Sequence, residues 1–522
     1  MNCYDLLLID PPMSYFTKKD VDVSSLLEIQ ETPYLAFNPG LLSIGSYIIE
    51  KNYSVKLHHI KSDTEIEEAK AEILNFGIPK MIAISCSYFQ TYETCLGLIE
   101  YFSKTYPESL LVIGGLHAGN MPGYVLEDSP YIDLVLSGEG EGTIEDLLNF
   151  IVRKQGRIED IGGISFGEKF LKRGYEIDKS CFDNCTIIDF IDEKSTKERT
   201  VQDTYTAKKA ARLISLDDMP FLHYDLYEDY KSYTCYVEES RSCYGKCEYC
   251  VAPIHGGFRY KKAERFLEEL DRAVSIFGLE NSYPFLASNF GVDVENTVKI
   301  LEGIIDKYGS SLRWNAEFRV DLNWEKYIDL MYRSGCRGFN IGMDSPCPKV
   351  LLQMNKTNNT THYLKKTYDL IDTISKYGDA AIVVNMMVYP GEDAETILAC
   401  IDFISKYYHN LAAVHYSPTN VYYDTVLWKN FNKYHERYGT TIVKSLYFDR
   451  VHIYPVNPSA LFDNNEANYW ARVIEKLFCN KSLFADYHET RLKRDKNGSL
   501  TDEAKASIAT MYTNNLEKKT SK

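Results

Sequence analysis

Long apolar runs are missing from this sequence of 522 residues. No stretch approaches the roughly 18 consecutive apolar residues that a transmembrane helix needs. The opening MNCYDLLLIDPP lacks the basic start of a secretory signal peptide, and its short LLLI run is typical of a buried strand. These absences predict a cytoplasmic chain without a membrane span.

Positive charge is also scarce, because 58 Lys and Arg residues face 74 Asp and Glu residues and the net charge is −16. Proteins that hold a nucleic-acid backbone need surfaces rich in Lys and Arg. The balance therefore predicts no nucleic-acid partner. The remaining composition, 45% hydrophobic and 25% charged, is ordinary for a globular protein, and the length favours two or three domains.

Without an export signal, the thirteen cysteines are expected to be thiols or metal ligands rather than a disulfide framework. Cys181 and Cys185 could form half of a metal site, but no second pair lies nearby, so packing is the preferred interpretation. Ten scattered cysteines, these two included, are expected to pack as small apolar groups: Cys3, Cys86, Cys95, Cys181, Cys185, Cys235, Cys336, Cys347, Cys400 and Cys479.

Residues 1–150 alternate short apolar runs with helical patterns, which predicts an α/β domain with a parallel, doubly wound sheet. The expected strands are 4–12, 54–60, 81–87, 109–115 and 132–138, and the expected helices are 39–52, 91–107 and 143–154. Ligands of such sheets bind beyond the carboxyl ends of the strands. Polar residues and glycines gather at those ends: Ser85, Ser87, Gly114, Gly115, His117, Gly138, Glu139, Gly140 and Glu141.

Residues 151–230 are less regular; GGISFG could form a sheet edge, and the polar STKERTVQDTYTAKKAAR is expected to be a linker or mobile arm. A second βα series covers residues 231–428, with strands expected at 233–240, 283–291, 312–320, 338–345, 380–391 and 411–420. Six strands with intervening helices predict a partial (β/α)6 barrel. Residues 429–522 are expected to be mostly helical.

The motif ESRSCYGKCEYC places Cys243, Cys247 and Cys250 in a C-x3-C-x2-C spacing at the end of the first barrel strand. Three thiolates on one loop can hold three irons of a [4Fe–4S] cluster and leave the fourth open to an external ligand. The alternatives are a zinc knuckle with a distant fourth ligand such as His255, or three incidental thiols. A zinc knuckle has no need of a following barrel, so the cluster is favoured.

With Tyr249 before its last cysteine, this motif resembles the signature of the radical S-adenosylmethionine (SAM) superfamily. The resemblance implies that SAM chelates the open iron and that an electron from the cluster releases a 5′-deoxyadenosyl radical. Later segments resemble the same family in order: YPFLASNFG, NAEFRVD, IGMDSPCPKVL and YPGEDAET. They imply SAM contacts at Tyr249, Ser288, Asn289, Glu317, Arg319 and Asp344. Taken alone, Arg319 could be a structural ion-pair partner and Asp344 a helix cap.

The segments NPGLLSIGSYI, IGGLHAGNMP and IDLVLSGEGEGTIEDLL resemble the cobalamin-binding domain that precedes the barrel in the B12-dependent branch of that family. The resemblance implies a Rossmann-like domain in which the strand-end residues given above bind cobalamin. Glycines there would let the backbone approach the corrin, although each could simply turn the chain or cap a helix. The Asp-x-His-x-x-Gly motif is absent, which implies cobalamin without a protein imidazole on cobalt; His117 is expected to line the corrin edge or to pack.

Together these resemblances imply a class B radical SAM methyltransferase that methylates an unactivated carbon through methylcobalamin and a 5′-deoxyadenosyl radical. Its cofactors would be a [4Fe–4S] cluster, SAM and cobalamin. Its partners would be a small-molecule or peptide substrate, expected to be a specialised metabolite or modified peptide, and an external electron donor of flavodoxin or ferredoxin type. The alternatives are a rearrangement or cyclisation by the same branch, a methylthiotransferase, and a non-catalytic cobalamin sensor.

Overall fold

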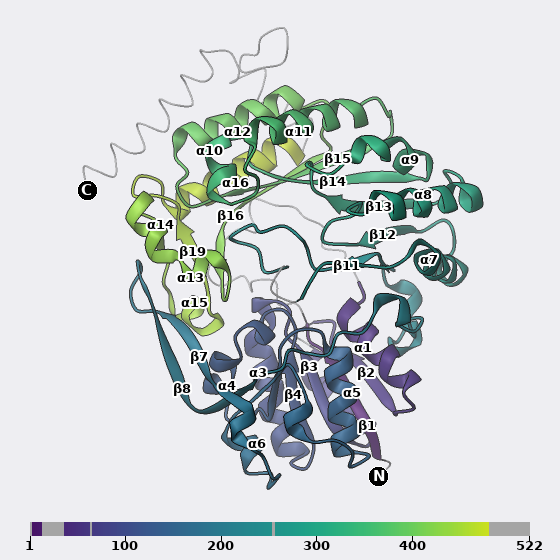
Figure 1. Ribbon diagram of the computed structural model, residues 1–522, viewed down its shortest axis with the longest axis vertical. Coiled ribbons are helices and arrows are strands. Elements are labelled where there is room, and N and C mark those ends of the chain that lie inside the picture. The colour runs from purple at the N-terminus through teal and green to yellow at the C-terminus, as the bar shows by residue number, and fades with distance from the viewer. Residues whose placement is uncertain (1–2, 13–35, 63–64, 253–255, 480–522) are drawn as a thin grey trace. The chain divides into compact units, whose positions relative to one another are not determined.

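The computed structural model describes residues 3–12, 36–62, 65–252 and 256–479 (Figure 1). The chain divides into two compact units, each made of more than one segment. The first unit comprises Met1–Asp189, Lys197–Tyr236 and Arg450–His452, and the second comprises Phe190–Thr196, Val237–Asp449 and Ile453–Lys522. The two units are described separately.

The first unit is built on a sheet of eight strands in the order β2-β1-β3-β4-β5-β6-β8-β7. The five parallel strands are β1 (Cys3–Asp10), β2 (Val55–His59), β3 (Ile78–Ser85), β4 (Leu110–Gly114) and β5 (Leu134–Leu136). Their central residues are almost entirely buried, as expected when helices cover both faces of a parallel sheet. The predicted doubly wound sheet is confirmed.

The helices of this unit are α1 (Pro39–Glu50), α2 (Ile66–Leu74), α3 (Tyr92–Thr105), α4 (Pro122–Asp128) and α5 (Gly140–Ile151). Asn38 begins α1 by accepting the Leu41 backbone N–H at 3.2 Å, and Pro39 occupies the first turn. The strand order reverses direction between β1 and β3, so right-handed crossovers put α1 on one face of the sheet and α3 and α4 on the other. The sequence patterns predicted α1, α3 and α5 but missed α2 and α4.

The prediction of a linker within residues 151–230 is wrong. This region forms β6 (Ile164–Phe166), α6 (Glu168–Leu171), β7 (Phe182–Phe190) and β8 (Thr196–Ala207), and the strands extend the sheet. The segment GGISFG contains β6, but the expectation of an edge is wrong, because β6 pairs antiparallel with β5 on one side and with β8 on the other. Half of the residues of β8 are exposed and only two are buried, so its sequence lacks an apolar alternation. Threonine, valine and tyrosine account for its strand preference.

The second unit contains a parallel sheet in the order β16-β15-β14-β13-β12-β9. Its strands are β9 (Val237–Glu238), β12 (Ser282–Leu286), β13 (Arg313–Phe318), β14 (Cys336–Asp344), β15 (Ala381–Val388) and β16 (Ala413–Pro418). The helices that connect them lie along its outside in Figure 1: α7 (Ala263–Phe277), α8 (Val294–Tyr308), α9 (Ile328–Arg333), α10 (Pro348–Gln353), α11 (Thr360–Ile374) and α12 (Ala394–Tyr407). The predicted partial barrel is confirmed.

Side chains of this sheet alternate between its two faces. On β13, Trp314, Ala316 and Phe318 are buried, and the Trp314 ring stacks on Phe285 with a centroid distance of 4.3 Å. The opposite face carries polar residues, among them Glu317 on β13 and His415 on β16. The second unit also holds all four tryptophans of the chain: Trp314, Trp324, Trp428 and Trp470.

Up to Cys479, the region after the barrel is largely helical, as predicted, but it also forms a small sheet in the order β17-β19-β18. The rest of the predicted helical region, 480–522, lies outside the described residues. Its elements are β17 (Asn420–Tyr422), α13 (Val426–Lys429), α14 (Phe431–Tyr438), β18 (Thr441–Ile442), α15 (Leu446–Val451), β19 (Ile453–Asn457) and α16 (Asn464–Cys479). Helix α16 packs along β16, the edge strand of the barrel sheet. Among the described helices, none combines the length and apolar character needed to cross a membrane.

Candidate functional site

The three cysteines lie on a loop that is closed at its base by a short antiparallel ribbon. Strands β10 (Ser240–Arg241) and β11 (Arg259–Tyr260) pair on either side of the loop. At its start, Ser242 adopts φ +65°, and its Oγ lies 3.0 Å from the Ala252 carbonyl oxygen and 2.8 Å from that of Gly256. The loop is thus held together across its own width.

The thiols of this loop accept hydrogen bonds from N–H donors. The Gly245 backbone N–H donates to Cys243 Sγ at 3.3 Å, and the Ala252 backbone N–H donates to Cys250 Sγ at 3.4 Å. Cys247 Sγ, which is buried, accepts from a guanidinium described below. Donors directed at all three sulfur atoms stabilise thiolates, the form in which cysteine binds metal.

The donor set fits an iron–sulfur cluster better than a single metal ion. Within the described ranges, no group of three or more His, Cys, Asp or Glu side chains is arranged to hold one ion. His255, the fourth ligand considered for zinc, lies outside the described residues. Three thiols with N–H donors to sulfur match the environment of a [4Fe–4S] cluster that has one open iron.

Backbone hydrogen bonds attach the cysteine loop to the elements around it. The Glu248 N–H donates to the Met354 carbonyl at 2.9 Å, and the Leu427 N–H donates to the Glu248 carbonyl at 2.8 Å. The Asn355 side-chain amide donates to the Lys246 carbonyl at 3.0 Å. These contacts hold the segment between Cys243 and Cys250 against the end of α10 and the start of α13.

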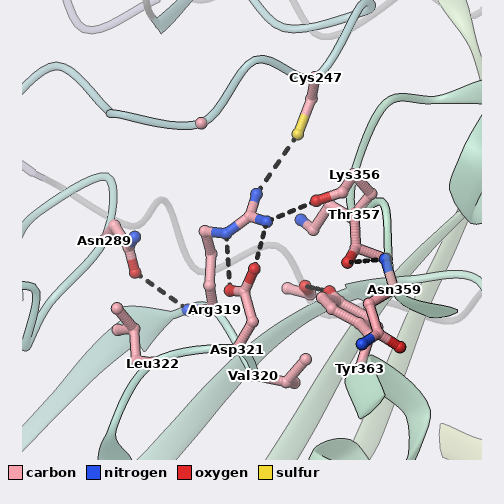
Figure 2. Close-up of polar contacts among 12 residues, drawn as sticks. Cys247, Asn289, Arg319, Val320, Asp321, Leu322, Lys356, Thr357, Asn359 and Tyr363 are labelled. Atoms are coloured by element: carbon pink, nitrogen blue, oxygen red, sulfur yellow. Dashed lines mark hydrogen bonds and ion pairs between the residues drawn. The ribbon is translucent and has the colours of Figure 1, made fainter. Parts of the chain in front are cut away.

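Arg319 lies at the end of β13 beneath this loop (Figure 2). Its Nε and Nη2 donate to the two carboxylate oxygens of Asp321 at 2.9 and 2.8 Å, and Nη2 also donates to the Lys356 carbonyl at 2.6 Å. Its Nη1 donates to Cys247 Sγ at 3.5 Å, while its backbone N–H donates to the Asn289 Oδ1 at 3.0 Å. The side chain is buried, so these contacts replace solvent.

A second buried charge pair lies at the end of β14. The Asp344 carboxylate accepts the Tyr249 hydroxyl at 2.6 Å and pairs with Lys356 Nζ at 2.7 Å. Asp344 adopts φ +66°, and the register with β15 shifts between Gly342 and Asp344. Asp344 and Tyr249 were singled out from the sequence, but Lys356 was missed because no motif surrounds it; only the fold reveals its buried amine.

The predicted SAM contacts therefore fall into two groups. Arg319, Asn289, Tyr249 and Asp344 hydrogen-bond to other protein groups, whereas the side chains of Ser288 and Glu317 are exposed. Partial desolvation by the surrounding protein raises the pKa of Glu317, and nearby His415 opposes the rise. Ser288 and Glu317 are the two that remain open to a ligand.

In the first unit, a hydrogen-bonded network links the carboxyl ends of β1 and β3. Asn38 Nδ2 donates to Asp10 Oδ1 at 2.9 Å and to Ser85 Oγ at 3.2 Å, and Ser85 Oγ lies 3.4 Å from Ser87 Oγ. The Tyr227 hydroxyl donates to Asp10 Oδ2 at 2.8 Å. Burial raises the pKa of Asp10 to about 6, against the opposing effect of these hydrogen bonds.

This network marks the point where the strand order reverses, which is where doubly wound sheets bind their ligands. The sequence patterns indicate Ser85 and Ser87 but not Asp10, Asn38 and Tyr227. Asp10 in an Asp-Pro-Pro turn directly after a buried strand was the available signal. Tyr227 had none, since it comes from a distant, irregular segment.

The exposed surface at the neighbouring strand ends fits a large, partly apolar ligand such as a corrin. Gly115 and Gly138 are exposed there, as are the side chains of Tyr88 and Leu116 at 55% and 47%. Gly115 is needed by the backbone itself: its φ is +100°, and a Cβ would lie 2.8 Å from the Cys86 carbonyl carbon and oxygen. The chain turn, given above as the alternative to close ligand approach, thus accounts for this glycine.

The other predicted cobalamin contacts are less open. The His117 imidazole is buried and lies edge-on to Tyr92, with ring centroids 5.3 Å apart, so it packs. Glu141 is buried and accepts the Ser43 hydroxyl at 2.6 Å. Gly114, Glu139 and Gly140 are half-buried.

Comparison with known protein families identifies both units. Residues 237–404 match the family model of the radical SAM superfamily, and residues 29–148 match the model of the B12 binding domain. The two matches lie where the sequence motifs placed them. They also give the order of the domains, with the B12-binding domain before the barrel.

Among characterised and uncharacterised relatives, an uncharacterized methyltransferase of Pyrococcus horikoshii is 23% identical over 437 residues, covering 82% of this chain and 83% of its own. The cobalamin-dependent radical SAM methyltransferase TokK of Streptomyces tokunonensis is 28% identical over 127 residues, which is 23% of this chain and 17% of its own. The cytidylyl-2-hydroxyethylphosphonate methyltransferase of Streptomyces wedmorensis is 22% identical over 386 residues, covering 66% of this chain and 68% of its own.

Solved structures share the fold along nearly the whole chain. The radical SAM methyltransferase TsrM of Kitasatospora setae, bound to tryptophan and a SAM analogue, superposes with a TM-score of 0.65 at 14% identity, covering 97% of this chain and 95% of its own. The cobalamin-dependent SAM radical enzyme OxsB superposes with a TM-score of 0.57 at 15% identity, covering 97% of this chain and 66% of its own. With both domains matched in the same order, the chain belongs to the B12-binding-domain-containing radical SAM enzymes.

Proposed function

We propose that this protein is a cobalamin-dependent radical SAM methyltransferase that methylates an unactivated carbon of a specialised metabolite or modified peptide. The observation that carries the proposal is the set of three thiols at Cys243, Cys247 and Cys250, each with its own N–H donor, on a loop braced at the end of the first barrel strand. The B12 binding domain in the same chain adds the methyl carrier.

When bound, a four-iron cluster would supply the electron that cleaves SAM, and cobalamin would supply the methyl group. The residues of the chain bind and orient. Cys243, Cys247 and Cys250 would hold the cluster, and Ser288 and Glu317 would contact SAM from the open face of the sheet. Ser87, Gly115 and Gly138 would meet the corrin at the strand ends, with Ser85 and Gly114 behind them.

The names of the relatives support methylation at carbon. One relative is a tryptophan 2-C-methyltransferase of Streptomyces laurentii, 24% identical over 173 residues, and another is the bacteriochlorophyllide d C-12(1)-methyltransferase of Chlorobaculum tepidum, 26% identical over 171 residues. The two names specify different substrates, and both specify the transfer of a methyl group. The electron is expected from an external flavodoxin- or ferredoxin-type donor, as the cluster must be reduced before SAM is cleaved.

A rearrangement or cyclisation with the same cofactors is the second candidate, because OxsB shares the fold and is described only as a radical enzyme. Deuterium labelling separates the two. With SAM that carries a CD3 group, methylation places three deuterium atoms in the product and yields S-adenosylhomocysteine. A rearrangement yields 5′-deoxyadenosine with an unlabelled product.

The first test is anaerobic purification with cobalamin supplied, followed by an absorption spectrum and counts of iron and cobalt. We expect about four irons and one cobalt per chain. Cys250→Ala should lose the iron and keep the cobalt, while Cys3→Ala, at an exposed cysteine of the first unit, should keep both. Full iron content in Cys250→Ala would contradict the cluster assignment.

The corrin site has its own test. Leu116→Asp puts a charge on the exposed apolar surface beside Gly115 and should weaken cobalamin binding about tenfold, since burying half of a leucine contributes on the order of 1.4 kcal/mol. Leu74→Asp, at the exposed end of α2, is the matched control. Equal affinities of both variants in equilibrium dialysis would remove the proposed site.

A further inference from the structure

We propose that Arg319 is a positioning residue of the cysteine loop, which it anchors through Cys247, and that it does not bind SAM. The inference rests on the proposed cluster. It reassigns a residue whose place in the sequence implied a SAM contact. It also explains Tyr244 and Gly245, two of the three residues between Cys243 and Cys247.

The guanidinium has little hydrogen-bonding capacity left for a ligand. Of its five N–H groups, four are directed to protein acceptors: two to Asp321, one to the Lys356 carbonyl and one to Cys247 Sγ. A carboxylate of SAM would need two neighbouring N–H groups for the two-pronged contact that makes arginine a strong carboxylate binder. That pair already holds Asp321.

The barrel fixes Arg319 from below through groups that cannot easily move. Asp321 is two residues further along the same segment, and the Lys356 side chain is itself tied to Asp344 at 2.7 Å. Asn289, which is fully buried, accepts the Arg319 backbone N–H at 3.0 Å. Figure 2 shows the guanidinium between these groups and Cys247.

The cysteine loop is shaped to receive the guanidinium from above. The Tyr244 ring centroid lies 5.8 Å from Arg319 Cζ, within the range of a cation–π contact. A Cβ at Gly245 would lie 3.1 Å from Arg319 Nη1 and 3.3 Å from Cys243 Sγ. Any side chain at 245 would therefore press on the guanidinium and the thiol together.

The contact has an electronic consequence for a bound cluster. A cluster gains negative charge on reduction, and hydrogen bonds to its sulfur atoms favour the reduced state and raise the reduction potential. An N–H of a permanent cation directed at Cys247 Sγ should have this effect. The residue thus acts through a cluster ligand and not on the substrate.

The test compares Arg319→Lys, Asp321→Asn and Gly245→Ala with the native holoenzyme. Arg319→Lys keeps the charge and loses the forked geometry, while the other two keep the arginine and disturb its placement. Arg337→Lys is the matched control: Arg337 bonds Asp379 at 2.7 Å at the opposite, N-terminal end of β14. Redox titration followed by electron paramagnetic resonance measures the potential, and equilibrium dialysis measures the affinity for SAM.

We expect each of the three variants to make cluster reduction about tenfold less favourable, which corresponds to about 59 mV for one electron. Their SAM dissociation constants should stay within twofold of native, and Arg337→Lys should change neither quantity. If Arg319→Lys fails to fold, Asp321→Asn and Gly245→Ala decide the matter.

Native potentials in all three variants would overturn the inference, and tenfold weaker SAM binding in Arg319→Lys would identify Arg319 as a SAM contact instead. The failure of the proposed function has a different signature. A native protein without iron would remove the proposed function and this inference together, whereas a native four-iron cluster with unchanged potentials in the variants removes the inference alone.

Discussion

Glycines of the first unit serve unlike purposes, and only the structure separates them. Gly115 occupies φ +100°, with the Cys86 carbonyl where a Cβ would be. Gly97 lies in α3, is exposed and has no atom within 4 Å of a Cβ position. Both read as small residues in the sequence, yet one is required by the backbone and the other weakens a helix.

We expect Gly115→Ala to lower the free energy of unfolding of the first unit by about 1–3 kcal/mol, because strained backbone and a close contact add together. Gly97→Ala should raise it by about 0.5–1 kcal/mol through helix propensity. Urea unfolding followed by circular dichroism measures both. Equal effects of the two substitutions would contradict the packing described for Gly115.

His117 gives the first unit a sensitivity to acid. Burial lowers its pKa to about 3, and nearby His452 adds to the lowering, so the folded protein holds the imidazole neutral. In the unfolded chain its pKa is about 6.5, so protonation favours unfolding once the pH falls below that value. The stability that depends on a neutral His117 is present above pH 6.5 and is lost progressively toward pH 3.

From this shift, about 2 kcal/mol of stability should be lost between pH 6.5 and pH 5, at about 1.4 kcal/mol per pH unit. His117→Gln should remove that loss, and His362→Gln, at an exposed position of α11, should not. Hydrogen exchange of peptides from β4 at both pH values measures the effect. Equal acid sensitivity of native protein and His117→Gln would show that another group is responsible.

The sequence identifies residues that form a motif of fixed spacing along the chain. Cys243, Cys247 and Cys250 stand out because three ligands of one cluster must be close along a loop. Asp321 and Lys356 could not be found in this way, since each is an ordinary charged residue until the fold brings it to a partner. The geometry also changes the meaning of Arg319, whose position in the sequence is the same for a ligand contact and for a loop anchor.

At the scale of elements, the end of β14 is joined to the loop that follows α10 by the pair of Asp344 and Lys356. Their side chains are 7% and 6% exposed, so removing one partner leaves a buried charge. Lys349 and Asp393 form a pair of similar length, 2.6 Å, that is 45% and 40% exposed. The two pairs allow a direct comparison of burial.

Lys356→Met should lower the stability of the second unit by about 3 kcal/mol, because an uncompensated buried carboxylate is costly. Lys349→Met should change it by less than about 1 kcal/mol. Tryptophan fluorescence during urea unfolding measures this unit selectively, since it contains all four indoles. Combining Lys356→Met with Asp344→Asn should recover part of the loss; no recovery would argue against a direct pair.

Elements with a run or a periodic pattern of apolar residues were predictable from the sequence, and elements without such a pattern were not. Strands β1, β3 and β4 are largely buried and rich in Ile and Leu, and β15 is rich in Val, so the sequence indicates all four. Strand β8 is polar, with half of its residues exposed and two buried, so its sequence resembles that of a linker. Strand β9 was predicted over 233–240 but pairs with β12 only at Val237–Glu238, because pairing depends on the neighbouring strand.

At the scale of the whole molecule, each unit includes residues from the other's stretch of sequence. Arg450–His452 belongs to the first unit, where the His452 imidazole lies 2.7 Å from the Asp128 carboxylate and stacks on Tyr124 with a centroid distance of 4.0 Å. No sequence pattern indicates this, since the three residues, which follow one another at the end of α15, belong to no motif. The domain boundaries expected from the sequence were contiguous, and the units are not.

His452→Ala should therefore destabilise the first unit by about 1–2 kcal/mol, through the lost hydrogen bond and ring contact, although the residue lies far along the chain. Faster hydrogen exchange in peptides of α4 would report it. An unchanged exchange rate in α4 would mean that the first unit does not depend on the distant segment.

The interleaved segments have a consequence for how the protein is made. When Tyr236 has left the ribosome, the first unit still lacks His452, which follows roughly two hundred residues later, on the order of 10–40 s at synthesis rates of about 5–20 residues per second. During that interval Asp128 and Tyr124 lack their contacts with the His452 imidazole. The nascent B12-binding domain therefore stays incompletely assembled until every strand of the barrel has been translated.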